Sequence, residues 1–307
     1  MIAAVMVRFL RAVLTVWMVV TAVFVIIRLT GDPIRSLLPE NTPEQIVAQY
    51  RHRWGLDKPI VDQYWTYLSR LAHGDFGVSY FDAQGALHSV LDKVPATLDI
   101  ALPAFLIAAA GGSALGVLAA VKRGSPVDRI VTTGAVAFAS FPPFLVGVIL
   151  VLVFGVKLKW LPTAGSSSMK SLILPIVTLV LASGSAIARI TRASMGSALD
   201  LPCITHAQAL RVSPRRQIFA HALPNAMLPL LTVLGFQLAY LIAGSTVVEV
   251  LLAWPGVGRL FVQAANQHDF AVVQCVVLLV TISVVSVNAL TDLAYKAADP
   301  RLRGTRR

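Results

Sequence analysis

Six long runs of uncharged and mostly apolar residues divide this 307-residue chain, and they restrict its fold more than any other feature. A helix that spans a membrane needs roughly 20 mostly apolar residues. All but the first and fourth runs reach that length unaided, and those two reach it if the arginines at their ends extend toward the headgroups. The runs are Ala12–Ile27, Ile100–Val121, Ile130–Val156, Ser171–Ala188, Ala222–Val248 and Phe270–Thr291. The chain is therefore predicted to be an all-α membrane protein with six transmembrane helices.

The composition agrees with this class. Hydrophobic residues make up 56% of the chain and charged residues 13%, whereas soluble domains are about 25% charged. Arg8 and Arg11 precede the first apolar run, as in a signal peptide, but no small-x-small cleavage site follows it. The first run is therefore predicted to be a retained span.

Lysine and arginine are unevenly distributed between the loops. With the N-terminus in the cytoplasm, 15 of the 26 lie on the inner side. The short outer loops carry only Lys157, Lys159, Lys170 and Arg259. This positive-inside bias predicts that both termini are cytoplasmic, and it explains the net charge of +11 without any nucleic-acid partner.

Three hydrophilic regions lie between the spans. Gly31–Asp99 and Leu252–Asp269 are predicted outside, and Arg189–His221 inside. The predicted organisation is a first transmembrane helix (residues 1–30), a long extracytoplasmic segment (31–94), and a five-helix core (95–307) with a cytoplasmic loop near 193–225. The first outer region is long for a connector, so it is either a functional loop or a structural cap over the spans.

The inner region contains a stretch interrupted by three prolines, THAQALRVSPRRQIFAHALPNAMLP, residues 205–229, which we call the punctuated stretch. Pro202 suits the first turn of a helix, and the Ser213-Pro214 step suits a break followed by a new helix start. A second short helix is predicted from Pro214 to about Ala222, ended by Leu223-Pro224, and Pro229 is predicted to kink the next span. Two short helices with a fixed elbow fit either a docking surface or a plain connection between spans.

Two motifs fall inside spans. FPPF, residues 141–144, places two prolines in the third run and predicts a kink facing a cavity. GGSALGV, residues 111–117, has the glycine spacing of a phosphate-binding loop, but Val117 stands where that loop needs lysine. Gly112 and Gly116 form a GxxxG pair, which predicts close helix packing.

No energy source or catalytic group is recognised in this chain. Asp99, Glu249 and Asp292 fall near span ends, which is unfavourable for a solitary ion-gradient carrier. Serines within spans (Ser140, Ser183 and Ser185) have no histidine at matching depth, as an intramembrane protease would need. Cys203 and Cys275 form no metal-binding or disulfide pattern. The chain is predicted not to be an enzyme and to hold no cofactor or metal of its own.

The chain resembles the dipeptide, oligopeptide, nickel and glutathione branch of binding-protein-dependent ABC importer permeases. The matching segments occur in the family's order and cover nearly the whole chain. The segments that carry the resemblance are GDP (31–33), GLDKPIVDQYWTYLSRLAHGDFGVSY (55–80), VPATLDIAL (94–102), FPPFLVGVIL (141–150), LPTAG (161–165), RITRASM (189–195), HALPNAMLP (221–229), EVLLAWPGVGRLFVQA (249–264), HDFAVVQ (268–274) and DPRLRG (299–304). The LDKP…QY…GDFG segment is similar to the first of two paired permeases.

The resemblance identifies the punctuated stretch with the family's cytoplasmic coupling loop, which docks on an ATPase subunit. In the register set by HALPN, the family's Glu-Ala-Ala falls on Thr205, His206 and Ala207, and its glycine on Arg211. Only the second alanine is kept. The candidate coupling residues are Thr205, His206, Ala207, Arg211, Ser213, Pro214 and Pro224. A bulky residue at Ala207 is predicted to uncouple ATP hydrolysis from transport.

The resemblance also implies a type I ABC importer permease fold in a bacterial cytoplasmic membrane, working by alternating access. The implied partners are a second homologous permease, two ATP-binding subunits or domains that hold ATP and magnesium, and an extracytoplasmic binding protein docking within Gly31–Asp99 and Leu252–Asp269. The implied substrates are di- or oligopeptides, with nickel complexes, glutathione and haem also compatible. The alternatives are a solitary ion-gradient carrier and an ABC-associated regulatory or assembly protein.

Overall fold

The computed structural model describes residues 2–30, 34, 39, 41–53, 55–79, 81 and 83–298. The predicted motifs at Gly31–Pro33 and Asp299–Gly304 lie outside the described residues. Regular structure in the described part is helical, apart from one isolated bridge between Val78 and Gly85. The chain divides into two compact units, one of residues 1–95 with 256–283 and one of residues 96–255 with 284–307.

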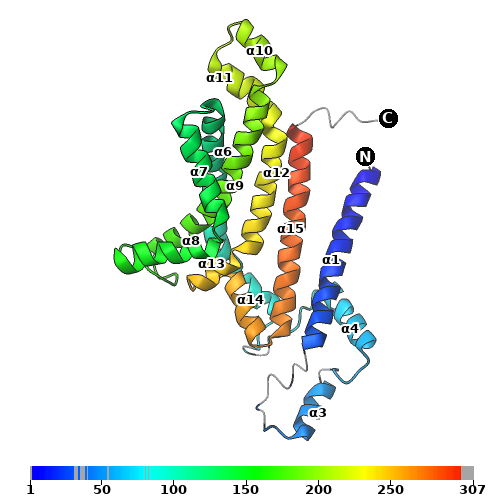
Figure 1. Cartoon of the computed structure of the whole chain (residues 1–307). Helices are drawn as coiled ribbons and strands as arrows, with labels where there is room; N and C mark the ends of the chain where they lie inside the picture. The colour runs from blue at the N-terminus through cyan, green and yellow to red at the C-terminus, as the bar shows by residue number, and fades with distance from the viewer. Residues whose placement is uncertain are drawn as a thin grey trace. The chain divides into compact units, whose positions relative to one another are not determined.

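Five helical stretches are long and apolar enough to cross a membrane, and one bent pair of helices can supply a sixth span. The five stretches are Met6–Leu29, Ala86–Val121, Met169–Leu199, Pro214–Leu251 and Phe270–Ala297. The all-α membrane class is therefore confirmed, with the third predicted span present as the bent pair (Figure 1).

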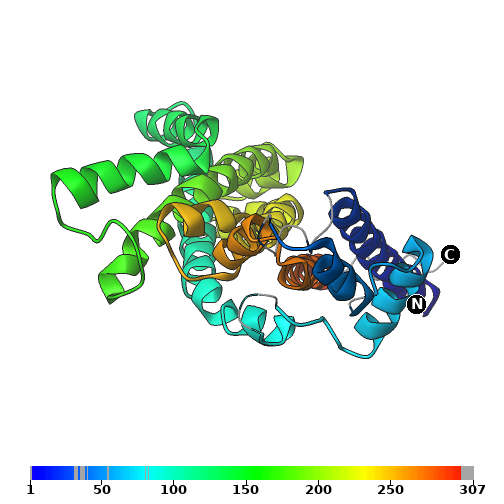
Figure 2. The same ribbon diagram turned by 90° about the horizontal axis from the view of Figure 1, so that it is seen from below.

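That bend is far sharper than the kink predicted for one continuous helix. Helix α7 (Pro126–Ser140) meets the helical stretch Pro143–Lys157, which begins with helix α8 (Pro143–Leu150), at an angle of 102°. Both Phe141 and Pro142 precede a proline and take extended ψ angles of 135° and 137°. Two consecutive extended residues end a helix, which corrects the expectation of a simple kink. Beyond the break, α8 continues as the π-helix η1 (Val151–Lys157), and Figure 2 shows this arm seen from below.

In the second unit, helices α6 (Val94–Val121) and α9 (Ile173–Leu199) approach closely through the predicted GxxxG pair. A Cβ atom on Gly112 would lie 2.8 Å from the carbonyl oxygen of Gly184, and one on Gly116 would lie 2.6 Å from that of Ala188. Only glycine permits this separation, so the prediction of close packing is confirmed. Helix α12 (Leu223–Gly244) also packs against α9.

In the same unit, helix α13 (Thr246–Leu251) contacts the N-terminal end of α6. The side chain of Glu249 is fully buried, and its Oε1 atom accepts hydrogen bonds of 2.9 Å from Thr97 and from Ser245. The indole N–H of Trp254 donates to the carbonyl oxygen of Ala96 at 2.7 Å. Glu249, weighed above as a proton-coupling candidate, is thus held by hydroxyl groups in a packed interior.

The first unit contains helices from both ends of the described chain. They are α1 (Ile2–Thr30), α3 (Glu44–Arg53), α4 (Ile60–Ala72), α5 (Ala86–Leu91), α14 (Val257–Asn266) and the first half of α15 (Phe270–Ala298). Ala86 and Val90 of α5 share one core with Ala264 of α14 and Val272 of α15. The two segments predicted to lie outside the membrane therefore pack together in this unit.

Candidate functional site

The punctuated stretch forms a helical hairpin in the second unit, projecting beyond the ends of α9 and α12 (Figure 1). Its first arm is helix α10 (Pro202–Ala209), with Pro202 at the first position as predicted. Its second arm begins with the short helix α11 (Pro214–Arg216), preceded by Ser213 at the N-cap position. Ser213 has an extended ψ of 143°, but its side chain makes no capping hydrogen bond. The predicted break at Ser213-Pro214 is confirmed.

Arg211 sets the elbow between the two arms. Its φ of 54° is in the left-handed region, which favours glycine. The amide of Val212 donates to the carbonyl of Ala207 at 3.0 Å, and the amide of Arg211 donates to that of Gln208 at 2.9 Å. These two bonds form a Schellman motif, in which glycine usually occupies the position of Arg211. The backbone at this position therefore has the conformation that the family's glycine would adopt without strain.

Replacing Arg211 by glycine is expected to stabilise the elbow. A non-glycine residue in the left-handed region costs about 1 kcal/mol or more, and the Arg211→Gly variant removes that cost. Amide hydrogen exchange at the elbow should slow about fivefold. The matched Arg211→Val variant places a β-branched side chain there and should exchange faster than the wild type. Faster exchange in the glycine variant would contradict the strained elbow.

The second arm does not end at Leu223-Pro224, and that prediction was wrong. Helix α11 runs into a π-helical turn, η3 (Gln217–Ala222), which continues directly into α12. Pro224 is exposed and lies in the first turn of α12, where the missing N–H of proline is tolerated. The hairpin is therefore continuous with a membrane span, so a displacement of the hairpin acts directly on α12.

Ile204 attaches the first arm to the rest of the unit. Its side chain is fully buried in a cluster with Ala120 of α6, Met195 of α9 and Ala226 of α12. Ala207, one turn further along α10, is also buried within the chain. The small side chain of Ala207 therefore faces the chain's own interior and not the exposed surface of the hairpin.

The outer surface of the hairpin combines basic and apolar side chains. Thr205, His206, Arg211, Ser213 and Pro214 are exposed. Leu210 and Phe219 are also exposed, by 66% and 62%. Neither residue is among the coupling residues predicted from the sequence. The signal that could have identified them is the presence of large apolar residues in an otherwise basic stretch. Together the exposed residues form a surface suited to a protein partner with an apolar and acidic face.

An ion pair joins helices α7 and α9 in the second unit. Arg192 of α9 donates to both carboxylate oxygens of Asp128 of α7, at 2.8 and 2.9 Å. Asp128 is buried and also accepts from the amide of Gly124 and the hydroxyl of Thr132. No local pattern indicates this pair, because its members are 64 positions apart.

Breaking this pair is expected to destabilise the second unit. The Arg192→Gln variant leaves the carboxylate of Asp128, whose side chain is 6% exposed, without its cation, so the free energy of unfolding should fall. The matched Arg123→Gln variant breaks the exposed pair with Asp200, and should cost less than about 1 kcal/mol. Denaturant titration of the detergent-solubilised protein measures both variants. Equal losses of unfolding free energy in the two variants would show that the pair of Arg192 and Asp128 has no special role.

Comparison with known proteins decides the family. The sequence profile of the binding-protein-dependent transport system inner membrane component matches residues 112–304, and that of the N-terminal part of the same component matches residues 1–101. The chain belongs to this family. It is an inner-membrane permease subunit of ABC transporters, and GGSALGV lies inside α6 rather than in a nucleotide-binding loop.

Two relatives match this permease over nearly its whole length. The glutathione transport system permease protein GsiC of Escherichia coli K12 is 36% identical, over 96% of this chain and 97% of its own. The di/tripeptide transport system permease protein DppB of Pseudomonas aeruginosa is 37% identical, over 92% and 93%.

Solved structures support the permease fold. An inward-facing structure of the MetNI methionine ABC transporter matches with a TM-score of 0.55 and 21% identity, over 68% of this chain and 96% of that chain. A structure of an amino acid ABC transporter matches with a TM-score of 0.53 and 16% identity, over 67% and 92%.

Proposed function

We propose that this permease imports di- or oligopeptides, including peptide-like molecules such as glutathione, delivered by an extracytoplasmic binding protein. The relatives that match nearly the whole chain are named for glutathione and for di- and tripeptides. The permease works with a second homologous permease and with two ATP-binding subunits or domains that hold ATP and magnesium. The positive-inside bias supports cytoplasmic termini, which places the hairpin of α10, α11 and η3 on the cytoplasmic side.

The observation that carries the coupling role is the attachment of this hairpin. Ile204 joins α10 to α6, α9 and α12 in one buried cluster, and η3 runs without a break into α12. When the ATP-binding subunits close, their movement at the exposed face of the hairpin is transmitted to these three helices. The helices then move as one packed body, because the glycines of α6 hold it against α9 without intervening side chains. As the spans tilt relative to one another, the substrate pathway opens alternately to the two sides of the membrane.

A pull-down tests the assembly and uptake tests the substrate. The tagged permease, extracted from its native membrane in mild detergent, should retain a second permease and ATP-binding subunits. Reconstituted with the binding protein in proteoliposomes, the complex should take up a labelled dipeptide only with ATP. A chain that purifies alone and supports uptake driven by an ion gradient would favour the solitary carrier instead. Assembly without any requirement for a binding protein would favour the regulatory role.

A further inference from the structure

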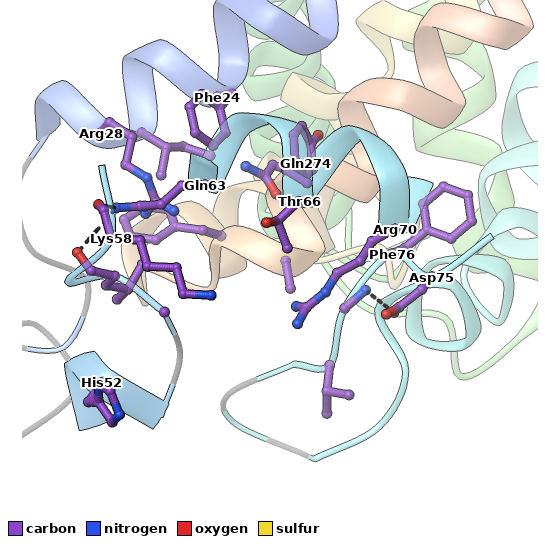
Figure 3. Close-up of a pocket in the computed structure, with 18 residues that line it drawn as sticks. Phe24, Arg28, His52, Lys58, Gln63, Thr66, Arg70, Asp75, Phe76 and Gln274 are labelled. Atoms are coloured by element: carbon purple, nitrogen blue, oxygen red, sulfur yellow. Dashed lines mark hydrogen bonds between the residues drawn. The ribbon is translucent and has the colours of Figure 1, made fainter. Parts of the chain in front are cut away.

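The first unit contains a cavity of about 590 Å³, which shares no lining residue with the hairpin (Figure 3). Its walls come from the end of α1, from α4 and the segments flanking it, and from the first turns of α15. Phe24, Ile27 and Tyr67 supply apolar surface, and Gln63, Thr66 and Arg70 of α4 supply polar groups.

Contacts between α1 and α4 fix the depth of this cavity. The hydroxyl groups of Thr21 and Tyr64 are 2.6 Å apart, and the ring of Phe24 stacks on that of Tyr67 at 5.5 Å between centroids. Thr21 lies seven residues before Arg28, or roughly 10 Å along the helix. Helix α4 therefore packs beside the last two turns of a membrane span, where hydrocarbon gives way to headgroups.

The opposite face of α4 supports the same depth. At 100° per residue, Val61 and Trp65 lie opposite Gln63 and Arg70. The side chains of Val61 and Trp65 are each 64% exposed. An amphipathic helix with exposed apolar residues and a tryptophan on one face is typical of the membrane interface.

The cavity carries an excess of positive charge. Among the described residues, Arg28, Lys58 and Arg70 line it together with one carboxylate, Asp75, which accepts a hydrogen bond from the amide of Gly77 at 2.9 Å. Figure 3 shows Lys58 and Arg70 extending toward the same space from two sides. The lining His52 is hydrogen-bonded to Asp57 at 2.7 Å, and this bond lowers the pKa of the Asp57 carboxyl group. Lys58 and Arg70 are therefore placed to bind an anion.

An unused acceptor lies beside these cations. The side-chain amide of Gln63 donates to the carbonyls of Leu56 and Lys58, at 3.1 and 2.8 Å. Its Oε1 atom is then buried and has no hydrogen-bond partner among the described residues. Leaving a buried acceptor unsatisfied is unfavourable. A ligand that satisfies this site carries both an anionic group and an N–H or O–H donor.

We propose that the cavity binds the headgroup of a membrane glycerophospholipid. Its phosphate lies between Lys58 and Arg70, and the ammonium or hydroxyl group of an ethanolamine or glycerol headgroup donates to Gln63. The apolar wall formed by Phe24, Ile27 and Tyr67 receives the first part of the acyl chains. The lipid belongs to the leaflet at the C-terminal end of α1, which is the outer leaflet in the orientation proposed above. Such a lipid fixes α4 against the first span.

Native mass spectrometry of the whole complex, purified in mild detergent with its partner subunits, tests this site. The wild type should retain a bound phospholipid. The Lys58→Gln/Arg70→Gln variant should retain about tenfold less of it, because two charged hydrogen bonds are lost. The matched Lys157→Gln/Lys170→Gln variant removes two exposed lysines elsewhere and should retain the lipid fully. Thermal unfolding of each complex confirms that the variants are folded.

Added lipids and inorganic phosphate distinguish the source of the anion. Phosphatidylethanolamine or phosphatidylglycerol added to delipidated complex should restore occupancy in the wild type but not in the Lys58→Gln/Arg70→Gln variant. Equal lipid retention in both variants would overturn the proposal. It would also be overturned if inorganic phosphate bound at this site and no lipid did. Neither result bears on peptide uptake, so this proposal and the proposed function can fail separately.

Discussion

The Ile204→Ala variant should assemble with its ATP-binding partners, but its rate of ATP-driven uptake should fall about tenfold. Truncating a fully buried isoleucine costs about 2–5 kcal/mol. Helix α10 has 8 residues, and isolated helices shorter than about 12 residues are marginal in water. Without Ile204, the docking surface is no longer rigidly joined to α6, α9 and α12. ATP hydrolysis should continue but no longer respond to the loaded binding protein.

Two measurements on proteoliposomes separate this outcome from simple misfolding. ATPase activity is measured with and without loaded binding protein, and uptake is measured in parallel. The matched Ile130→Ala variant makes the same truncation at a side chain of α7 that is 73% exposed, and it should keep both activities. Wild-type uptake by the Ile204→Ala complex would show that the buried cluster does not transmit the movement.

The Gly116→Val variant should fail to form a stable permease. Its Cβ atom would meet the carbonyl oxygen of Ala188 and the Cβ of Thr191, each at 2.6 Å. Both neighbours belong to α9, and one is backbone, so neither can move without separating the two helices. Overpacking of this kind costs about 1–3 kcal/mol or more. The variant should be degraded in membranes, or unfold at a much lower denaturant concentration than the wild type.

Gly111 provides the control for this substitution on the same helix. A Cβ atom added there meets no atom within 4 Å. The Gly111→Val variant introduces the same β-branched residue and should accumulate close to the wild-type level. If both variants accumulated equally, the close approach of α6 and α9 would not be needed for stability.

Features that depend on local chemistry were predictable from the sequence. The apolar runs gave the spans, because the length needed to cross a bilayer is fixed. The proline at Pro202 and the Ser213-Pro214 step gave the start and the break of the hairpin, because proline restricts its own backbone and that of its neighbour. The spacing of Gly112 and Gly116 gave the close packing of α6.

Other features depend on cooperation between neighbouring residues or on distant contacts. Pro142-Pro143 turns the chain by 102° because both preceding residues become extended, whereas one proline only kinks a helix. Pro224 was predicted to end the second arm, but the π-helical turn before it allows the helix to continue. The direction in which Ala207 points depends on how α10 packs, and so does the burial of Ile204.

Contacts across long sequence separations left no local pattern. The pairing of Asp128 with Arg192 joins residues on different helices, and the shared core of α5 and α14 joins segments more than 160 positions apart. The predicted docking region for a binding protein includes both segments of that core.

Crosslinking from Cys203 tests most directly whether the hairpin is the coupling site. Cys203 is exposed on α10 and Cys275 is buried, so a thiol-reactive photocrosslinker labels the hairpin of the unmodified chain. In the purified complex, irradiation should join the permease to an ATP-binding subunit, and the Cys203→Ser variant should give no product. A product with the extracytoplasmic binding protein, or none with an ATP-binding subunit in an assembled complex, would contradict the proposed coupling role of α10.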